Sequence, residues 1–491
     1  MQQIGMEKQR TPHARSKKRT LARQKGSGHL VGAWRRRAGN LAFAHLLIGC
    51  VMSRLFKRDQ TFDYPVIERG DGIYLFDTEG RRYIDGTSGA GNVTLGHGRQ
   101  RIAQVMAQQA GELAYCFSSA FTNRPAMALA ERVVASSPPG LNHAYFVSGG
   151  SEGVETALKL ARQYHLLRGN AGKQVVIARW RGYHGGSLGA VSATGVPSLR
   201  DPFEPWLAPF PHISPCYPYR CEAPGCQGTC DLSCARELEE AILAAGPESV
   251  AAFIAEPVVM AGMAAVPAAE GYFQEVRRIC DAYDVLFIAD EVITGYGRTG
   301  KHFAIEHWDT TPDLLVFGKG ASSGYVPLGG VLVSDQMADT FAQKQAFFAH
   351  IFTYVNNPVS AAVGLEVLDI MEEEQIVEHS ERVGALALGR ARKLQQHGCV
   401  GEVRGKGLLL GMELLLDPAT KTPFDPSHQV SRRATKLCLE RGLSIVGMTA
   451  KDWDGGDDIR FYPPLTIEPK QVEESIEIID DVIGLLSKEF C

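Results

Sequence analysis

Between His143 and Val333 the sequence repeats one pattern, in which a short apolar run precedes a polar or glycine-rich segment and a stretch with helical spacing. The clearest runs are 175–178 ("VVIA"), 250–255 ("VAAFIA") and 285–289 ("VLFIA"). A strand with one face in water alternates apolar and polar residues, whereas a strand buried on both faces is apolar throughout. The pattern therefore predicts an α/β fold whose mostly parallel sheet is covered by helices on both faces.

Other segments predict the remaining elements. Residues 151–167 carry apolar residues at intervals of three and four, which is typical of a helix. The segment 72–86 ("GIYLFDTEGRRYIDG") predicts a β-hairpin, and a long helical region is expected over 358–396. The shorter runs after it, in 401–414 and 459–467, predict a smaller α+β domain at the C-terminus.

The length of 491 residues exceeds that of a usual domain of ~100–200 residues, so more than one domain is expected. We predict a basic, disordered extension over residues 1–52 and a large domain over 111–380. A small domain would be formed by residues 53–110 together with residues 381–491. The composition, 45% hydrophobic and 22% charged, is sufficient for a large core.

The charge is unevenly distributed along the chain. The net charge is −4, but residues 1–52 carry eleven Lys or Arg and one acidic residue, Glu7, so the rest of the chain has a net charge of −14. An acidic body is not typical of a protein whose main surface binds nucleic acid. We therefore expect small-molecule ligands and no nucleic-acid partner.

The basic head ends in an apolar run, Leu41 to Met52. A bilayer span needs ~20 apolar residues, so we expect no membrane helix here. Three alternatives remain: a signal sequence in which "LLIGC" resembles a lipoprotein cleavage box, an organelle transit peptide, or an unstructured extension that reflects an upstream start codon. We favour the extension and a cytoplasmic protein, whereas a transit peptide would direct the protein to mitochondria.

Five of the eleven cysteines lie between Cys216 and Cys234, at spacings of x4, x4, x3 and x3. Clustered cysteines occur in zinc sites and in disulfide frameworks. However, the segment has no CxxC pair, and its spacing matches no common zinc finger. Zinc, one or two disulfides and a plain Pro/Cys-rich loop stay open; we favour the loop and expect no metal.

Lys319 is the one Lys or Arg between His302 and Gln343, and it stands in the glycine-flanked stretch "DLLVFGKGASSGYVPLGG". An amine in an apolar pocket has a lowered pKa and becomes nucleophilic. A single loop lysine is more often solvated, so the interpretation depends on its partners.

Three potential partners follow other predicted strands. Asp290 closes the strand "LFIAD", where it caps a turn or faces a cation such as a protonated ring nitrogen. Ser151, in "SGGSE", begins a helix whose free N–H groups could bind a phosphate. Tyr183, in "RGYHGG", packs in the core or stacks on a ring. Because ligands of parallel sheets bind at the carboxyl ends of the strands, these residues predict one site.

Together these residues resemble the class III, pyridoxal-phosphate-dependent aminotransferases, the group of the omega-transaminases and the ornithine and GABA aminotransferases. The resemblance extends from about Asp63 to Glu474 and is most specific over 253–330, in "FIAEPV", "LFIADEVITGYGRTG" and "FGKG". It implies transferase fold type I, pyridoxal 5'-phosphate as cofactor, and a homodimer or dimer of dimers with shared active sites.

The resemblance assigns roles around the cofactor ring. Lys319 would bind the cofactor covalently and later transfer a proton, and Asp290 would pair with the pyridine nitrogen. Val292 would pack against one face of the ring and Tyr183 would cover the other. Glu256 would lie near the ring oxygen.

The resemblance also assigns the phosphate and the substrate. Gly150 and Ser151 would bind the phosphate, and Thr353, with Phe352 beside it, would reach the phosphate of the neighbouring subunit. Arg460 would receive a substrate carboxylate, to which a bidentate guanidinium is suited.

Departures from the family pattern narrow the substrate. Ornithine-type members have a glutamate that neutralises the substrate-binding arginine, whereas this chain has Ala261 there, so Arg460 would lack that switch partner. This loop resembles the omega-amine and taurine–pyruvate branch. Tyr115 and Phe117 would line the pocket, and Gly91 replaces a tryptophan of some omega-transaminases, which implies a wider pocket.

The resemblance implies ping-pong transfer of an amino group from an amine or amino acid to a 2-oxo acid, pyruvate or 2-oxoglutarate. An amino-acid racemase, an aminomutase or a decarboxylating transaminase on the same scaffold is the alternative. A protein that kept the fold without the chemistry is a third hypothesis, against which the presence of Lys319, Asp290 and the phosphate loop argues.

Overall fold

The computed structural model describes residues 54–221, 230–449 and 455–490. The basic head and Cys226 lie outside these ranges, so the predictions made for them stay predictions. Pro65–Cys491 forms one compact unit, and the description below concerns that unit.

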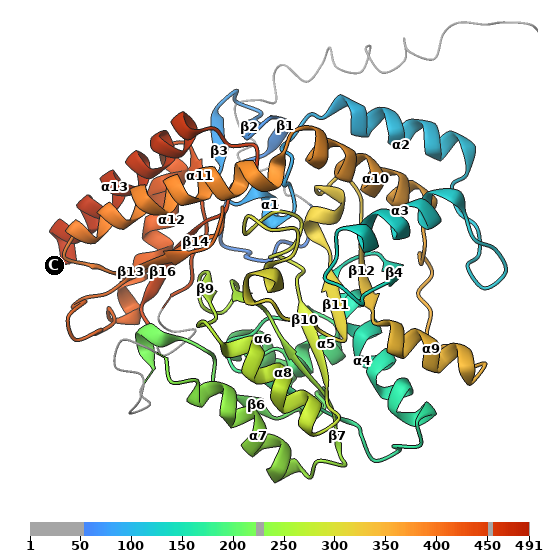
Figure 1. Ribbon diagram of the computed structural model, residues 1–491. Helices are drawn as coiled ribbons and strands as arrows, with labels where there is room; N and C mark the ends of the chain where they lie inside the picture. Colours follow the sequence, from blue (N-terminus) through green and yellow to red (C-terminus); the bar gives the residue numbers. More distant parts are fainter. Residues whose placement is uncertain (1–53, 222–229, 450–454, 491) are drawn as a thin grey trace, which may run out of the picture. The chain divides into compact units, whose positions relative to one another are not determined.

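A seven-stranded sheet lies within this unit (Figure 1), in the order β4-β12-β11-β10-β7-β5-β6. All its strands except β12 run in the same direction. The strands are β4 His143–Val147, β5 Val175–Arg179, β6 His212–Ile213, β7 Val250–Ala255, β10 Leu286–Asp290, β11 Leu314–Phe317 and β12 Gly329–Val333. The prediction of an α/β fold with a mostly parallel sheet is confirmed.

Strand β10 shows why these strands are apolar throughout. Leu286 and Ile288 belong to the hydrophobic cluster that includes residues of α4 Gly150–Leu167 and α5 Leu188–Ala193. Phe287 and Ala289 belong to the other cluster, with residues of α7 Ser233–Ala245 and α8 Tyr272–Ala282. Since successive side chains of a strand point to opposite faces, a strand between two helical layers is apolar at every position.

Strand β12 is antiparallel to both of its neighbours, β11 and β4. The connection from β11 to β12 covers residues 318–328 and contains a short 3-10 helix, Lys319–Ser322. A parallel crossover needs a dozen or more residues and usually an α-helix, so this short connection returns the chain in the opposite direction.

Segments from both ends of the compact unit share a second sheet. β1 Ile67–Asp71, β2 Tyr74–Asp77 and β3 Arg82–Asp85 form an antiparallel meander, and β15 Leu443–Ser444 pairs with β3 in parallel. The predicted hairpin is therefore confirmed. A third sheet, antiparallel, contains β13 Val400–Gly405, β14 Leu410–Leu414 and β16 Asp457–Phe461. The predicted domain boundaries stay predictions.

The helical region expected over 358–396 is divided into α10 Pro358–Glu373, α11 Ile376–Ala391 and a 3-10 helix, Arg392–Gln396. Gln375 interrupts the α-helices because its φ of 49° is left-handed, a conformation that a right-handed helix cannot contain. Other elements are α1 Ser88–Gly91, α2 Gln100–Glu112, α3 Arg124–Ala135, α6 Pro197–Arg200, β8 Val258–Val259, β9 Val266–Pro267, α9 Asp335–Gln343, α12 Val430–Glu440 and α13 Pro469–Phe490.

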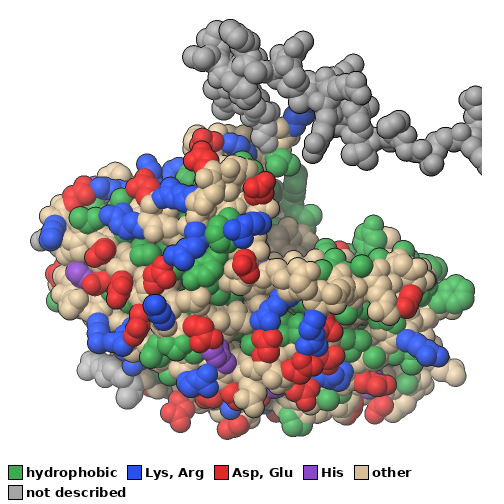
Figure 2. All heavy atoms as spheres, turned by 90° about the horizontal axis from the view of Figure 1, so that it is seen from above, with side chains coloured by type: hydrophobic (Ala, Val, Ile, Leu, Met, Phe, Trp, Pro, Cys, Tyr) green, Lys and Arg blue, Asp and Glu red, His purple; other side chains and the backbone are tan. Residues whose placement is uncertain are grey.

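Basic and acidic side chains are interspersed over the face of the molecule seen in Figure 2, so they form no single basic surface on that face. Within the described part of the chain, none of the helices combines the length and the apolar character that crossing a membrane requires.

Candidate active site

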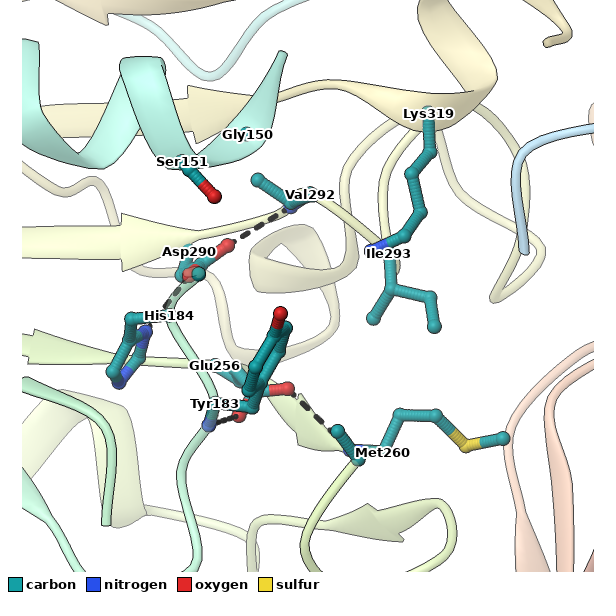
Figure 3. Close-up of a pocket in the computed structure, with 12 residues that line it drawn as sticks. Gly150, Ser151, Tyr183, His184, Glu256, Met260, Asp290, Val292, Ile293 and Lys319 are labelled. Atoms are coloured by element: carbon teal, nitrogen blue, oxygen red, sulfur yellow. Dashed lines mark hydrogen bonds and ion pairs between the residues drawn. The ribbon is translucent and has the colours of Figure 1, made fainter. Parts of the chain in front are cut away.

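A cavity of about 230 Å³ opens at the carboxyl edge of the large sheet (Figure 3). Parallel strands bring their carboxyl ends to the same edge, and residues that follow β4, β5, β7, β10 and β11 meet there. Seven residues predicted from the sequence line the cavity: Gly150, Ser151, Tyr183, Glu256, Asp290, Val292 and Lys319. The other lining residues are His184, Gly185, Met260, Ala261 and Ile293.

Asp290 is the last residue of β10 and is buried. One carboxylate oxygen, Oδ1, accepts the backbone N–H of Val292 at 3.1 Å, and the other, Oδ2, lies 2.8 Å from Nδ1 of His184. Figure 3 shows both interactions. A buried carboxylate that is bonded through both oxygens has a fixed orientation, so Asp290 presents a defined acceptor to the cavity.

His184 is the functional candidate that the sequence reasoning missed. Its ring is buried, its backbone N–H donates to the Thr194 hydroxyl at 2.9 Å, and its Nδ1 forms a hydrogen bond with Oδ2 of Asp290 at 2.8 Å. Its Nε2 has no hydrogen-bond partner among the described residues. The sequence feature that could have identified His184 is its position next to Tyr183 in "RGYHGG", after the same strand.

Lys319 follows β11 and opens the 3-10 helix. Its φ of 43° lies in the left-handed region, which costs a residue other than glycine about 1–3 kcal/mol. Burial lowers the pKa of Lys319, and the negative charges of Asp290 and Glu256 oppose this effect. Because burial is the largest influence, a larger fraction of Lys319 is in the neutral amine form than of a solvated lysine.

Glu256 follows β7 and links two other parts of the lining. Its Oε1 accepts the backbone N–H of Tyr183 at 2.9 Å, and its Oε2 accepts that of Met260 at 3.4 Å. Burial raises the pKa of Glu256, and the charge of Asp290 acts in the same direction. The Tyr183 ring projects into the cavity (Figure 3).

Gly150 and Ser151 begin α4 at the opposite wall of the cavity. The Ser151 hydroxyl accepts the backbone N–H of Gly186 at 3.0 Å. A Cβ on Gly150 would stand 2.6 Å from Cγ1 of Val292, so only glycine allows this approach of helix and strand end. The helix start therefore presents unpaired N–H groups and a hydroxyl beside the cavity.

Gly91, in the N-terminal part of the compact unit, lies beside two residues that line the cavity, Ile293 and Lys319. A Cβ at this position would lie 3.6 Å from Cδ of Lys319 and 3.2 Å from two side-chain atoms of Ile293. The residue also has a left-handed φ of 83°. A large side chain at position 91 would thus enter the space around Lys319.

Five of the predicted residues do not line this cavity, and four of them lie on two loops. Thr353 and Phe117 are exposed, and Phe352 and Tyr115 are half-buried. Their two loops are neighbours, because the rings of Tyr115 and Tyr354 lie 6.4 Å apart. The structure therefore gathers these residues on a surface outside the pocket of their own chain.

Arg460 is also outside the lining, and although position 261 carries no glutamate, another acidic residue is bonded to this arginine. Asp458 binds it with both oxygens, at 2.7 Å from Nε and 2.8 Å from Nη2. The carbonyl of Ala261, a lining residue, accepts from Nη1 at 2.9 Å. Residues two apart on a strand project from the same face, which brings Asp458 beside Arg460 on β16.

The cavity fits pyridoxal phosphate. It offers an amine of lowered pKa for covalent attachment, an oriented carboxylate for a protonated ring nitrogen and an aromatic ring to cover the cofactor. A Cβ on Gly149 or Gly186 would meet nothing within 4 Å, so space remains beside the helix start for a phosphate.

Comparisons with known proteins agree with this site. The family model "Aminotransferase class-III" matches residues 56–483. The putrescine–pyruvate aminotransferase of Pseudomonas aeruginosa is 36% identical over 417 residues, which cover 84% of this chain and 89% of that protein.

Solved structures are similar in fold. A transaminase from the marine bacterium Virgibacillus has a TM-score of 0.83 and 39% identity, and the match covers 88% of this chain and 95% of that one. The omega-transaminase of Pseudomonas jessenii, solved in complex with PMP, has a TM-score of 0.82 and 32% identity, with 87% and 94% covered.

A match over most of the chain, at identities well above those that show the fold alone, establishes the family. The cavity contains the amine, the carboxylate and the helix start that the cofactor chemistry of this family needs. This chain belongs to the class-III aminotransferases and is a pyridoxal-phosphate-dependent transaminase.

Proposed function

We propose that the enzyme moves an amino group from a primary amine or amino acid to pyruvate, in two half-reactions that use one pocket in turn. The observation that carries this proposal is the convergence of Lys319, Asp290 and Glu256 at the carboxyl edge of the sheet. Only a shared pocket lets both substrates meet the same amine and carboxylates, which is the requirement of a ping-pong cycle.

The lining residues would hold the cofactor as follows. Lys319 would attach it through Nζ, and Asp290 would hold the ring nitrogen protonated. Val292 and Tyr183 would contact the two faces of the ring, and Glu256 would lie near the ring oxygen. Gly150 and Ser151 would bind the phosphate, with N–H groups and a hydroxyl. When bound, the cofactor carries the amino group and accepts electrons released at the substrate carbon.

Lys319 is the proton carrier in this proposal. Once its amine is released from covalent attachment, Nζ removes a proton from the substrate carbon and returns one to the adjacent position. The lowered pKa of Lys319 supports this role, because a neutral amine is needed to accept the proton. The apolar side chains of Val292, Ile293 and Met260 line the pocket and limit access of water to the reacting atoms.

The arrangement of cations favours pyruvate over 2-oxoglutarate. Lys319 is the one basic side chain of the Lys or Arg type among the described lining residues. Arg460 adjoins the pocket through Ala261, but Asp458 offsets its charge. An acceptor with one carboxylate needs one guanidinium, whereas 2-oxoglutarate would leave its second carboxylate without a cation.

The donor is proposed to be a bulky primary amine, because Gly91 has no side chain that could enter the space around Lys319 and Ile293. A Gly91→Trp variant would fill that space, so turnover of bulky amines should fall while that of small amines persists. Equal losses for small and bulky amines would contradict the proposed pocket width.

The test of the reaction is a panel of amines and amino acids, each incubated with holoenzyme and either pyruvate or 2-oxoglutarate. Alanine, formed together with a ketone or aldehyde, is the expected product, and glutamate should form more slowly. Glutamate formation at an equal or higher rate would refute the acceptor preference. Loss of optical activity of an amino acid, without alanine, would refute the transaminase cycle in favour of a racemase.

We further propose that the enzyme is a homodimer whose active sites are shared. Phe117, Phe121, Ile351 and Tyr354 are 56%, 66%, 46% and 62% exposed and belong to two neighbouring loops. A soluble monomer seldom exposes so many adjacent aromatic and aliphatic side chains, which supports cover by a second copy. Thr353, in the same loop, would then reach the partner's pocket. Light scattering should give twice the chain mass of 53.4 kDa, and a stable monomer would contradict the proposal.

A cytoplasmic location is also proposed. Among the described residues, Cys116, Cys216, Cys234, Cys280 and Cys438 are free cysteines, and free thiols are typical of a reducing compartment. Fractionation of the source cells should recover the activity with cytoplasmic marker enzymes; recovery with mitochondria would instead support a transit peptide in residues 1–52.

A further inference from the structure

Three cysteines with no part in the pocket lie close together beside the large sheet. Cys216 follows β6, Cys234 lies in the first turn of α7, and Cys230 precedes that helix. Their sulfur atoms all lie within 4.8 Å of one another. Cys216 and Cys234 are 1% and 4% exposed. The fold thus brings three thiols together at a buried point.

We propose that Cys216, Cys230 and Cys234 bind one zinc ion in a structural site. The Zn–S distance is about 2.3 Å, so two sulfur ligands of a tetrahedral zinc stand about 3.8 Å apart. Sulfur atoms within 4.8 Å of one another reach this geometry if they approach by about 1 Å or less. Thiolates select zinc over magnesium and calcium, which prefer oxygen ligands.

Groups that stabilise negative charge lie beside two of the three sulfur atoms. The backbone N–H of Ala269 donates to Sγ of Cys216 at 3.2 Å. The positive charge of Arg179 also acts on the Cys216 sulfur and favours its negative form. Cys234 lies at the N-terminus of α7, where the helix dipole stabilises negative charge.

Arg179 also balances the charge of the proposed site. Three thiolates and one Zn²⁺ together carry a single negative charge. The Arg179 guanidinium is 1% exposed, and its Nε has no hydrogen-bond partner among the described residues. A buried cation needs a compensating negative charge, and the zinc–thiolate group supplies one.

A second cavity, of about 920 Å³, gives access to the cluster. Cys234 lines this cavity together with Cys221, Tyr217 and Glu237. It offers an entry path for the ion and room for a fourth ligand, which is a water molecule or the Cys221 sulfur. Each thiol loses its proton when it binds the metal, so binding is expected to release protons to the buffer.

The proposed zinc holds structure and takes no part in transamination, since none of its ligands lines the active-site cavity. It connects the segment after β6 to the start of α7, which packs on α8. Loss of zinc should therefore lower thermal stability and leave the turnover number nearly unchanged. This proposal replaces the sequence-based expectation that the segment binds no metal.

The test measures zinc in the purified holoenzyme by elemental mass spectrometry. The protein is produced in cells grown with zinc and is passed through gel filtration under reducing conditions before the measurement. We expect about one zinc per protomer in the wild type. Single Cys216→Ala, Cys230→Ala and Cys234→Ala variants should retain less than about a tenth of it. Cys438→Ala, a buried cysteine on α12, is the matched control and should keep the full amount.

Cofactor absorbance of each variant shows whether it has folded, and the half-buried Cys230 is the position least prone to disturb folding. Equal zinc contents in the wild type and in folded Cys230→Ala would overturn the proposal. The proposal would also be overturned if the purified protein contained no zinc and mass spectrometry after alkylation showed a disulfide between any two of the three cysteines. Zinc should raise the unfolding temperature of the wild type and of Cys438→Ala only.

Discussion

Replacing His184 by alanine tests a residue whose role is seen only in the folded protein. Its Nδ1 donates one hydrogen bond to the Asp290 carboxylate at 2.8 Å, and both side chains are buried. A hydrogen bond to a charged group contributes about 1.5–3 kcal/mol. Since about 1.4 kcal/mol corresponds to a factor of ten, its loss amounts to about 10- to 150-fold.

We expect this loss in the affinity for pyridoxal phosphate, because Asp290 would be free to turn away from the cofactor ring. The assay titrates the apoenzyme of His184→Ala with pyridoxal phosphate and follows the visible absorbance to obtain the dissociation constant. His184→Asn is the rescue variant, since its amide nitrogen can take the place of Nδ1 and donate to the same oxygen. It should recover a large part of the lost affinity.

The matched control is His397→Ala. His397 forms the same kind of pair, with Nε2 2.7 Å from Asp480, but near the surface and outside the pocket lining. A surface pair contributes about 0.2–1 kcal/mol to stability and should not affect the cofactor. If His184→Ala bound the cofactor within about threefold of the wild type, like the control, the reasoning that His184 orients Asp290 would be refuted.

Lys319→Ala should abolish turnover while pyridoxal phosphate still binds without a covalent bond, detected by dialysis and borohydride reduction; full turnover would contradict its role. Asp458→Asn frees the Arg460 guanidinium, so the KM for pyruvate should fall about tenfold, which corresponds to the free energy of one charge-assisted hydrogen bond. A raised KM would contradict this and would mean that Asp458 holds Arg460 in place. Burial raises the pKa of Glu291 from 4.5 to about 7, so its contribution to stability is present at low pH and is lost as the pH rises through 7. Between about pH 4.5 and 8, the wild type should lose about 3 kcal/mol relative to Glu291→Gln in thermal unfolding, whereas parallel pH profiles would contradict this.

The sequence located most of the pocket because its residues follow strands. Asp290 comes directly after a wholly apolar run, Lys319 follows one after Gly318, and Ser151 follows another after Ser148 and two glycines. Once the runs are read as parallel strands, their carboxyl ends must meet at one edge. The local sequence pattern therefore predicts, without knowledge of any contact, that these residues lie close together.

Other features depend on the direction of the backbone, which the periodicity of apolar residues does not determine. The helical spacing over 358–396 does not reveal that Gln375 takes a left-handed φ. The apolar run of β12 is the same for a parallel and an antiparallel strand, and the short connection before it decides the direction.

Side-chain partners were harder still to predict. Asp458 and Arg460 stand two residues apart, but only once β16 is known to be a strand do they share a face. Cys216 and Cys234 are 18 residues apart, and the cysteine spacing of this segment matches no common zinc finger. Their sulfur atoms meet because Cys216, just after β6, lies beside the start of α7.

The sequence by itself thus determined the layered α/β architecture, the edge at which the pocket forms and most of the residues that line it. Each of these follows from a repeated local pattern of apolar strands and helices. The tertiary structure alone decided that His184 bonds Asp290, that Asp458 occupies Arg460 and that three cysteines converge. These contacts are set by side-chain directions and chain reversals, which bring together groups on different elements or on the same face of one strand.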